Sequence, residues 1–252
     1  MDTEGDVGTY TSIAVEGIGA GQKIHITYRD ETNKALKYAY YGKIDVYTTE
    51  IKHYERGENY EGDLPQDKII VPRAKTEDKT IWFLNTFDSG GVGKYSSLKQ
   101  DSFKNLHVAY YDDAFRNLKY AKKTGEVREE VIKTHTYKYK GENDEEWSET
   151  NSEKSFEGIT IAHQTIDSDG NVGEYASLAL DTAGKVHIAY FDATKYNLKY
   201  ISNQSGPFIS SVVDSGGHTG IYTSIAVKNN KVYISYHQYM PQDSLRFAQA
   251  EK

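Results

Sequence analysis

The stretch that decides the fold runs from Val172 to Tyr200 and reads VGEYASLALDTAGKVHIAYFDATKYNLKY. Three other segments repeat its residue types in the same order, and they begin at Val7, Val92 and Thr219. Each copy contains a Gly-x-Tyr-x-Ser block, then a block such as His-Ile-Ala-Tyr, then Leu-Lys-Tyr or a close variant of it. A repeat that extends over the whole chain indicates one repetitive domain.

The alternation of residue types within each copy is typical of β-strands. In the copy quoted above, residues 175–180 and 186–190 are predicted to form a hairpin, because Asp-Thr-Ala-Gly between them has the composition of a tight turn. A third strand contains Leu-Lys-Tyr, and a fourth strand precedes the next copy. These fourth strands are predicted at 81–87, 159–166 and 208–213.

Four antiparallel strands in a unit of about 45 residues are typical of a β-propeller blade. We therefore predict an all-β protein whose residues 1–252 form a single domain, a four-bladed β-propeller. The alternative is a five-bladed ring in which an inserted segment forms a degenerate blade. Neither insert contains a Tyr-x-Ser or Leu-Lys-Tyr block, which favours four blades.

Two insertions interrupt the repeat. The repeated tyrosines are 85, 80 and 47 positions apart, so the first two intervals are much longer than the last. The excess lies at about 43–79 and 122–158, where charged and apolar residues alternate, which predicts two inserted β-arms that elongate the third and fourth strands. The arms contain related turns at 56–59 and 140–143, and the acidic stretch 142–147 is predicted to be a solvated tip with one aromatic residue.

The composition limits the classes of function. A net charge of -7 argues against non-specific nucleic-acid binding, which depends on Lys and Arg side chains that neutralise phosphates. The absence of cysteine excludes disulfides, thiolate metal sites and cysteine nucleophiles. No stretch approaches the roughly 20 apolar residues that span a bilayer, so no membrane span is expected. The 22 tyrosines add buried ring area to a hydrophobic content of only 37%.

The repeat also carries a family resemblance. The pattern Gly-x-Tyr-x-Ser-Leu-Ala-Leu-Asp-x-x-Gly-x-x-His-Ile-Ala-Tyr-x-Asp, followed by Asn-Leu-Lys-Tyr, resembles the repeats of sialidase-like (BNR or Asp-box-like) β-propeller proteins of bacteria and archaea. The resemblance covers all four copies and implies an extracellular or cell-surface location. The Asp-box itself, Ser-x-Asp-x-Gly-x-Thr-Trp, is not met, because Ser177 and Asp181 are too far apart and no Thr-Trp follows Gly184. Propellers host binding, scaffolding and catalysis alike, so the resemblance leaves the function open.

Strand order places a candidate site on one rim of the domain. In an antiparallel four-stranded unit, the start of the first strand, the end of the second, the start of the third and the end of the fourth share one side. Aromatic rings beside Asp, Asn and Lys suit sugars, whose ring hydrogens stack and whose hydroxyls need donors and acceptors. The alternative is that these aromatic residues only cap the blades. The predicted ligand-binding residues are Tyr10, Arg29, Asp30, Tyr95, Tyr111, Asp112, Phe115, Tyr175, Phe191, Asp192, Tyr196, Tyr222 and His237, with Arg116 and Tyr239 in the same turns.

Residues that recur in every copy also have structural explanations. Asp112 and Lys119 are expected to pair across the turn between the second and third strands, and the repeated Ser hydroxyl is expected to satisfy a backbone group. His25, His107 and His187 lie away from the rim and are separated by whole copies, so we expect each to pack with a satisfied ring nitrogen rather than to share a metal.

No metal or cofactor is predicted. Residues 167–171, Asp-Ser-Asp-Gly-Asn, resemble a fragment of a calcium loop, but the later ligands are missing and the other copies have Gly in place of Asp169. The sequence contains neither a Gly-rich phosphate loop nor a cluster with metal-ligand spacing.

Three functions from different classes stay open at this point. The first is a non-catalytic module that binds glycans or another extracellular ligand at the rim. The second is a glycoside hydrolase of sialidase type, for which the resemblance implies an arginine triad; only six arginines exist, and Arg56, Arg73 and Arg128 fall in the inserts. Paired carboxylates of a simpler glycosidase stay open as well. The third is an assembly role for the inserted arms. We expect binding without catalysis.

The last copy is expected to have three strands, because the chain ends at Lys252, soon after the third. An uncovered third strand has unpaired backbone groups, and such an edge invites pairing with another chain. We therefore expect either a short edge with the charged end 249–252 or a homo-oligomer formed through this edge or the arms. Upstream residues that supply the missing strand are the alternative.

Overall fold

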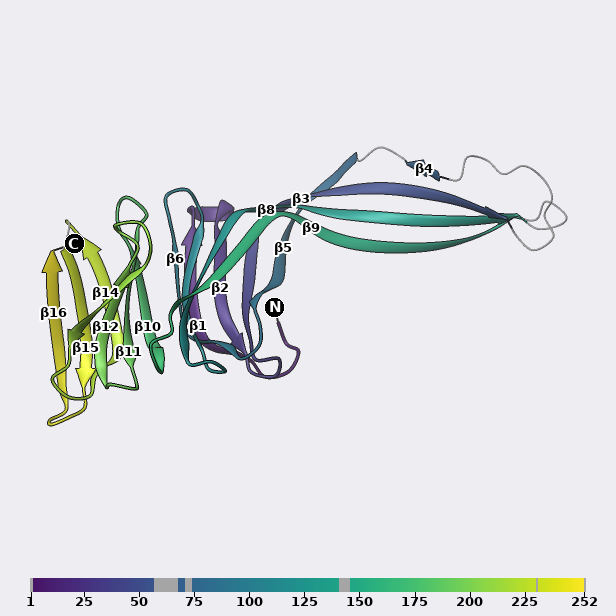
Figure 1. Ribbon diagram of the computed structural model, residues 1–252. Helices are drawn as coiled ribbons and strands as arrows, with labels where there is room; N and C mark the ends of the chain where they lie inside the picture. The colour runs from purple at the N-terminus through teal and green to yellow at the C-terminus, as the bar shows by residue number, and fades with distance from the viewer. Residues whose placement is uncertain (1, 57–67, 71–73, 141–145, 230, 252) are drawn as a thin grey trace. The chain divides into compact units, whose positions relative to one another are not determined.

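The computed structural model describes residues 2–56, 68–70, 74–140, 146–229 and 231–251 (Figure 1). Within these residues the chain is all-β, and its strands form four antiparallel sheets of three or four strands. The prediction of an all-β protein is therefore confirmed. The turns predicted at 56–59 and 140–143, and most of the tip predicted at 142–147, lie outside the described residues.

The strands of each sheet follow one another in chain order. Sheet 1 consists of β1 (Val7–Glu16), β2 (Lys23–Asp30), β3 (Ala35–Arg56) and β5 (Ala74–Asp88), with a short 3-10 turn at Gly19–Gly21. Sheet 2 consists of β6 (Val92–Gln100), β7 (Leu106–Asp112), β8 (Asn117–Lys140) and β9 (Glu146–Asp167). Sheet 3 consists of β10 (Val172–Leu180), β11 (Val186–Asp192), β12 (Asn197–Ser202) and β13 (Ile209–Asp214). Sheet 4 consists of β14 (Thr219–Lys228), β15 (Lys231–Gln238) and β16 (Ser244–Glu251), so it has the three strands that the sequence predicts.

The chain divides into two compact units. The core unit contains 1–42, 82–125 and 160–252, and the arm unit contains Lys43–Ile81 and Glu126–Ile159. Strands β3, β5, β8 and β9 contribute residues to both units. The arm unit is thus made of elongated third and fourth strands.

Within the arm unit, the two elongated hairpins pair with each other. Strand β3 runs parallel to β8, in a register from Asp45 opposite Glu129 to Arg56 opposite Lys140. The short strand β4 (Lys68–Ile70) pairs antiparallel with β3. Lys75 forms ion pairs with Asp45 at 2.9 Å and with Asp78 at 2.7 Å. Such exposed ion pairs contribute little stability, so the arm unit is held together mainly by backbone pairing between its strands.

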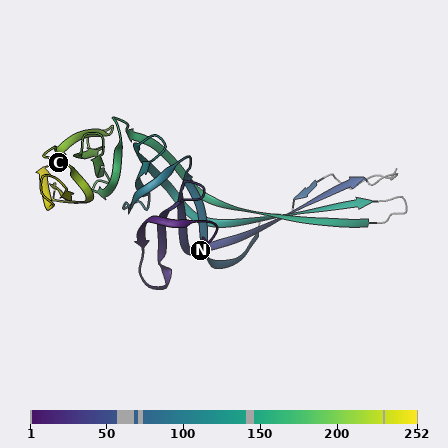
Figure 2. The same ribbon diagram turned by 90° about the horizontal axis from the view of Figure 1, so that it is seen from below.

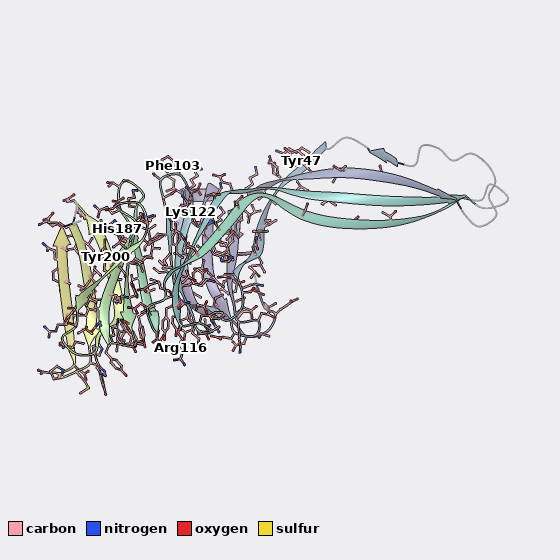
Figure 3. All side chains as sticks on the ribbon, viewed as in Figure 1. Tyr47, Phe103, Arg116, Lys122, His187 and Tyr200 are labelled. Atoms are coloured by element: carbon pink, nitrogen blue, oxygen red, sulfur yellow. The ribbon has the colours of Figure 1, made fainter. Side chains whose placement is uncertain are left out.

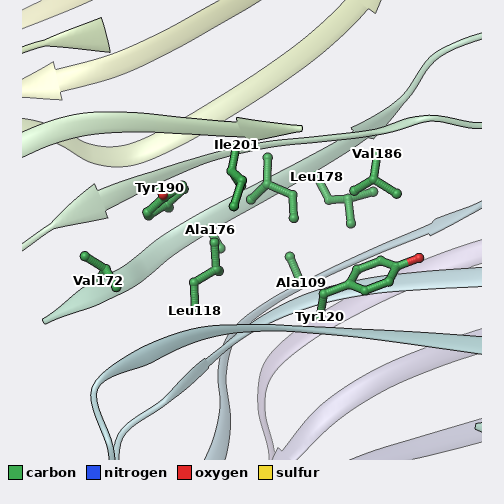
Figure 4. Close-up of a cluster of buried hydrophobic side chains, with 10 residues drawn as sticks. Ala109, Leu118, Tyr120, Val172, Ala176, Leu178, Val186, Tyr190 and Ile201 are labelled. Atoms are coloured by element: carbon green, nitrogen blue, oxygen red, sulfur yellow. The ribbon is translucent and has the colours of Figure 1, made fainter. Parts of the chain in front are cut away.

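In the core unit, consecutive sheets pack face to face through their first strands. Strand β6 contacts β1, β10 contacts β6, and β14 contacts β10. Figure 2 shows the ribbon from below. Figure 4 shows the junction between sheets 2 and 3, where the side chains are fully or almost fully buried. This cluster contains Ala109, Leu118 and Tyr120 of sheet 2 and Val172, Ala176, Leu178, Val186, Ile188, Tyr190 and Ile201 of sheet 3.

The repeated glycine allows this close approach of sheets. A Cβ atom on Gly173 would lie 2.8 Å from the Leu118 Cα, closer than real Cβ atoms pack, and Gly173 also has a φ of +109°. Such a backbone conformation favours glycine over any residue with a side chain. The repeated Leu of the Leu-Lys-Tyr block therefore packs on the glycine of the next copy.

The repeated serine joins neighbouring sheets, as expected. The Leu98 amide donates to the Ser12 Oγ at 3.0 Å, and the Leu178 amide donates to the Ser97 Oγ at 3.0 Å. The Ile225 amide donates to the Ser177 Oγ at 3.3 Å. Each hydroxyl satisfies a backbone N–H at the place where the strand pairing is irregular.

The expected pairing of Asp112 with Lys119 is wrong. The Lys119 ammonium instead lies 2.5 Å from Asp88, which also accepts a hydrogen bond from the Tyr110 hydroxyl at 2.7 Å. Asp112 accepts bonds from backbone amides of its own turn. The sequence pattern was misleading because Asp88, at the end of the preceding sheet, is distant in sequence from Lys119 and close to it in space.

The repeated histidines are packed with a satisfied ring nitrogen, as predicted. The Nδ1 atoms of His25, His107 and His187 lie 2.7, 2.7 and 2.5 Å from the hydroxyl of the tyrosine thirteen positions later in each copy. All three imidazoles are buried. They belong to the framework of the core unit and not to a shared site.

Candidate ligand-binding rim

Four tyrosine rings form a continuous row across the four sheets. They are the repeated residues Tyr10, Tyr95, Tyr175 and Tyr222, here called the tyrosine row. Consecutive ring centroids are 5.0, 4.6 and 4.8 Å apart, with interplanar angles of 63°, 43° and 67°. These edge-on and tilted contacts lie within the favourable range for aromatic pairs. Residues about 50 to 85 positions apart in sequence are thereby brought together.

The local backbone explains how the row arises. Each of the four tyrosines has a positive φ, between 51° and 55°, and follows two positions after a glycine that also has a positive φ. The strand pairing shifts register on both sides of this segment in every sheet. Such bulges redirect a side chain out of the regular alternation. A bulky residue at positive φ costs roughly 1–3 kcal/mol, which the surrounding contacts must offset.

Further aromatic rings extend the row over sheets 3 and 4. The Phe191 ring lies 6.3 Å from Tyr175 and 6.3 Å from Tyr196. The Tyr196 ring stacks on His218 at 4.0 Å with an angle of 6° between the planes. The His218 ring lies 6.3 Å from Tyr239. These contacts, which join a strand end with three turns, make one aromatic surface.

His218 is a member of this surface that the sequence reasoning missed. It lies two positions before the glycine of the Gly-x-Tyr block in the last copy, where the other copies have Asp6, Gly91 and Asn171. The copies differ at this rim position, as they do at Arg29, Tyr111, Phe191 and His237, and this difference is the signal in the sequence that points to His218.

Several of the predicted aromatic residues are open to solvent. The exposed fractions are 75% for Phe115, 70% for Tyr222, 56% for Tyr239, 46% for Tyr196 and 38% for Tyr10. Tyr111 and Phe191, in contrast, are only 6% exposed and support the row from beneath. The rings that a ligand can reach are therefore concentrated in the turns and at the ends of the row.

Arg29 joins two sheets and does not face solvent. Its guanidinium is buried and donates to Glu31, to the Val92 carbonyl at 2.7 Å and to Asp113 at 2.9 Å. Arg29 belongs to the predicted rim, but its hydrogen bonds connect sheet 1 with sheet 2. Figure 3 shows Arg116 at the end of the sheets where the predicted rim lies.

The three rim aspartates hold the turns between the second and third strands. Asp30 accepts bonds from the backbone and side-chain nitrogens of Asn33, both at 2.8 Å. Asp112 and Asp192 each accept two backbone amides of the following turn. All three are buried. Burial acts to raise the pKa of Asp30, but the hydrogen bonds from Asn33 prevail and lower the pKa below its ordinary value.

Tyr95 and Tyr175, in the middle of the row, are neutral phenols near pH 7. Burial raises the pKa of Tyr95 and Tyr175 above the ordinary value for tyrosine, and it raises the pKa of Tyr111 to about 12. A neutral phenol both donates and accepts a hydrogen bond and presents an apolar ring face. The rim can therefore stack on an apolar surface and exchange hydrogen bonds with hydroxyl groups.

The carboxylates of residues 167–171, the segment that resembles a fragment of a calcium loop, have protein partners. Asp167 accepts from Tyr190 and lies 2.5 Å from the Lys199 ammonium, while Asp169 lies 2.9 Å from Lys195. In the part of the chain that the structure describes, no three His, Asp or Glu side chains are grouped to hold a metal ion.

A scan of the chain against models of known protein families finds no match, and a search of curated proteins finds none either. Among the described residues, the structure contains no helix of the length and apolarity needed to cross a membrane.

Proposed function

We propose that this chain is a sialidase-like (BNR or Asp-box-like) β-propeller repeat protein whose four sheets are blades. In this proposal it acts outside the cell or on its surface as a non-catalytic module that binds carbohydrate at the rim. The single observation that carries the proposal is the tyrosine row with its continuation through Tyr196, His218 and Tyr239.

The chemistry of this surface suits a sugar better than a charged or purely apolar ligand. Exposed ring faces such as those of Tyr196 and Tyr222 stack on the C–H faces of sugar rings. The phenol hydroxyls and the His237 imidazole, which lies 3.5 Å from Asp243, supply donors and acceptors for sugar hydroxyls. The repeated spacing of the rings matches a ligand that is itself a chain of similar units.

A glycan array followed by calorimetric titration with the best-bound oligosaccharide tests the proposal. We expect Tyr196→Ala and Tyr222→Ala each to weaken binding by at least about fivefold, since loss of one stacking ring costs about 1 kcal/mol or more. Phe103→Ala is the control, because Phe103 is more exposed than either tyrosine and Figure 3 places it at the opposite end of the sheets from Arg116. Binding that is lost only in Phe103→Ala would contradict the proposal.

A further inference from the structure

The core unit builds the same junction three times. In each case the Leu of the third strand packs against the glycine of the next sheet. A Cβ on Gly93 would lie 3.0 Å from the Leu36 Cα, and those on Gly173 and Gly220 would lie 2.8 Å from the Cα atoms of Leu118 and Leu198. The same junctions share the serine bonds described above and a backbone bond from the first strand to the preceding turn. The three junctions are thus equivalent in detail.

One half of this junction is exposed on sheet 1. Leu98, Leu178 and Ile225 occupy equivalent positions on the first strands of sheets 2 to 4 and are 1%, 0% and 8% exposed. Ile13, at the same position in sheet 1, is 60% exposed, and Val15 next to it on the same face is 52% exposed. We call the surface formed by Gly8, Thr11, Ile13 and Val15 the leading face. It is largely apolar, and no described residue of the core unit buries Ile13 or Val15.

The leading face contains a hollow that can accept an apolar side chain. In the described part of the chain, a Cβ on Gly8 would meet no atom within 4 Å, in contrast to its three equivalents. A hollow of about 270 Å³ opens there, and it is almost entirely apolar. The hollow is lined by Asp2, Val7, Gly8, Thr11, Ile26, Tyr28 and Ala39. At the internal junctions, a leucine of the preceding sheet packs at this position.

The other half of the junction is exposed on sheet 4. Leu36, Leu118 and Leu198 are all 0% exposed, whereas Leu245, the equivalent residue of sheet 4, is 84% exposed. Phe247, two positions further on, is 63% exposed. We call the surface formed by Ser235, Leu245 and Phe247 the trailing face. Together the two faces are the two halves of a junction that the chain already forms three times.

We propose that the trailing face of one molecule binds the leading face of a second copy of this chain, head to tail. The partner is identified by complementarity: Leu245 would pack over Gly8 of the second copy, and Ser224 would accept from the Ile13 amide there. The two faces do not cover each other within one molecule, because Ile13 and Leu245 are 60% and 84% exposed.

Two copies would place eight sheets in one ring, which is the upper end of the usual range of propeller blades. A head-to-tail contact of this kind forms a closed ring when the rotation per step divides a full turn. The tyrosine row would then continue between molecules, with Tyr222 of one copy beside Tyr10 of the next. This inference concerns the junction faces and does not depend on sugar binding.

The mass in solution, measured by light scattering over a range of concentrations, tests the proposal. We expect the native chain to associate to twice its mass of 28.5 kDa. Leu245→Asp and Ile13→Asp should each shift the chain to the monomer mass, because each buries a charge in one half of the contact. Ile18→Asp is the control, since Ile18 is 91% exposed in the loop after β1 and belongs to neither face.

Mixing the two variants makes the test specific for head-to-tail contact. The Leu245→Asp chain keeps its leading face and the Ile13→Asp chain keeps its trailing face. An equimolar mixture should therefore form dimers, whereas each variant by itself should stay monomeric. Folding of each variant is checked by circular dichroism. A native chain that stays monomeric at its highest soluble concentration would overturn the proposal. So would a dimer that persists in both variants, because it would show contact through another surface.

Discussion

The Nδ1 atom of His25 lies 2.7 Å from the hydroxyl of Tyr38, and both side chains are buried. The same pairing of His and Tyr recurs in sheets 2 and 3. In sheet 4 the corresponding residues are Tyr233 and Phe247, whose ring centroids are 6.3 Å apart. The hydrogen-bonded pair is thus replaced by an aromatic contact in the one sheet whose trailing face is exposed.

The buried histidine predicts acid sensitivity. Burial lowers the pKa of His25 to about 4, so the imidazole stays neutral in the folded protein while the unfolded chain titrates near 6.5. Above pH 6.5 the histidine is neutral in both states, so its protonation does not lower the free energy of unfolding. As the pH falls from 6.5 to 4, only the unfolded state takes up the proton, so up to about 3 kcal/mol is lost.

Urea unfolding measured between pH 7.5 and 4.5 checks this expectation. His25→Gln should flatten the decline of unfolding free energy over that range, because the group that takes up a proton only in the unfolded state is removed. An equal slope in the native chain and in His25→Gln would contradict the prediction.

The buried ion pair between sheets 2 and 3 predicts a large loss of stability. Asp167 accepts from the Tyr190 hydroxyl and lies 2.5 Å from the Lys199 ammonium, and all three groups are buried. Asp167→Ala leaves the Lys199 charge buried without its carboxylate, which typically costs about 3–5 kcal/mol. Urea unfolding at pH 7 measures the change.

Asp169→Ala is the control for that measurement. The Asp169 side chain is 73% exposed and its ion pair with Lys195 is open to solvent. Exposed pairs contribute about 1 kcal/mol or less, so this change should be small. Similar losses in the two variants would show that Asp167 is not the buried link that its contacts indicate.

The strand pattern was predictable because every copy states it independently. The period of two, the turn residues and the order of blocks all point to the same four-stranded unit, and the structure shows four such sheets, the last with three strands. The parallel pairing of β3 with β8 was not predictable. It joins two inserts that are about 80 residues apart, and no local sequence pattern specifies which distant strand will pair with a charged strand.

The candidate site was predictable in position but not in the roles of its residues. Tyr10, Tyr95, Tyr175 and Tyr222 meet because strand order fixes the rim on which they lie. Arg29 lies at the same place in the pattern, yet the geometry of Asp113 and Val92 draws its guanidinium between two sheets. A polar residue on a rim turns inward when the next sheet offers it an acceptor, and sequence alone does not reveal that acceptor.

The repeated glycine predicts a steric limit at the internal junctions. Gly173→Ala would place a methyl group 2.8 Å from the Leu118 Cα, so the backbone would have to move. The alanine would also be strained at a φ of +109°. We expect a loss of at least about 3 kcal/mol in unfolding free energy. Gly184→Ala is the control, because it lies in a turn at a φ of +74° where a Cβ meets nothing within 4 Å. It should cost about 1 kcal/mol.

The same comparison measures packing and backbone strain together. A φ of +109° is more strained for alanine than a φ of +74°, so a larger loss in Gly173→Ala reports the contact with Leu118 together with this additional strain. Equal losses in urea unfolding would mean that the close approach of sheets 2 and 3 is relaxed at little cost. The glycine would then be required by its backbone conformation only.

The burial of the rim aspartates predicts that the protein does not hydrolyse glycosides. Glycosidases use two carboxyl groups that face the scissile bond, one as an acid and the other as a base or nucleophile. Asp30, Asp112 and Asp192 are at most 4% exposed, and each accepts hydrogen bonds from the turn that follows it. They hold the turns in place and have no path to a substrate. A screen of chromogenic glycosides over a range of pH should therefore show no turnover above the uncatalysed rate, and Asp112→Asn should alter stability without altering that result. Turnover by the native chain that disappears in a variant of a single rim Asp or Glu would contradict this prediction and would favour the hydrolase alternative.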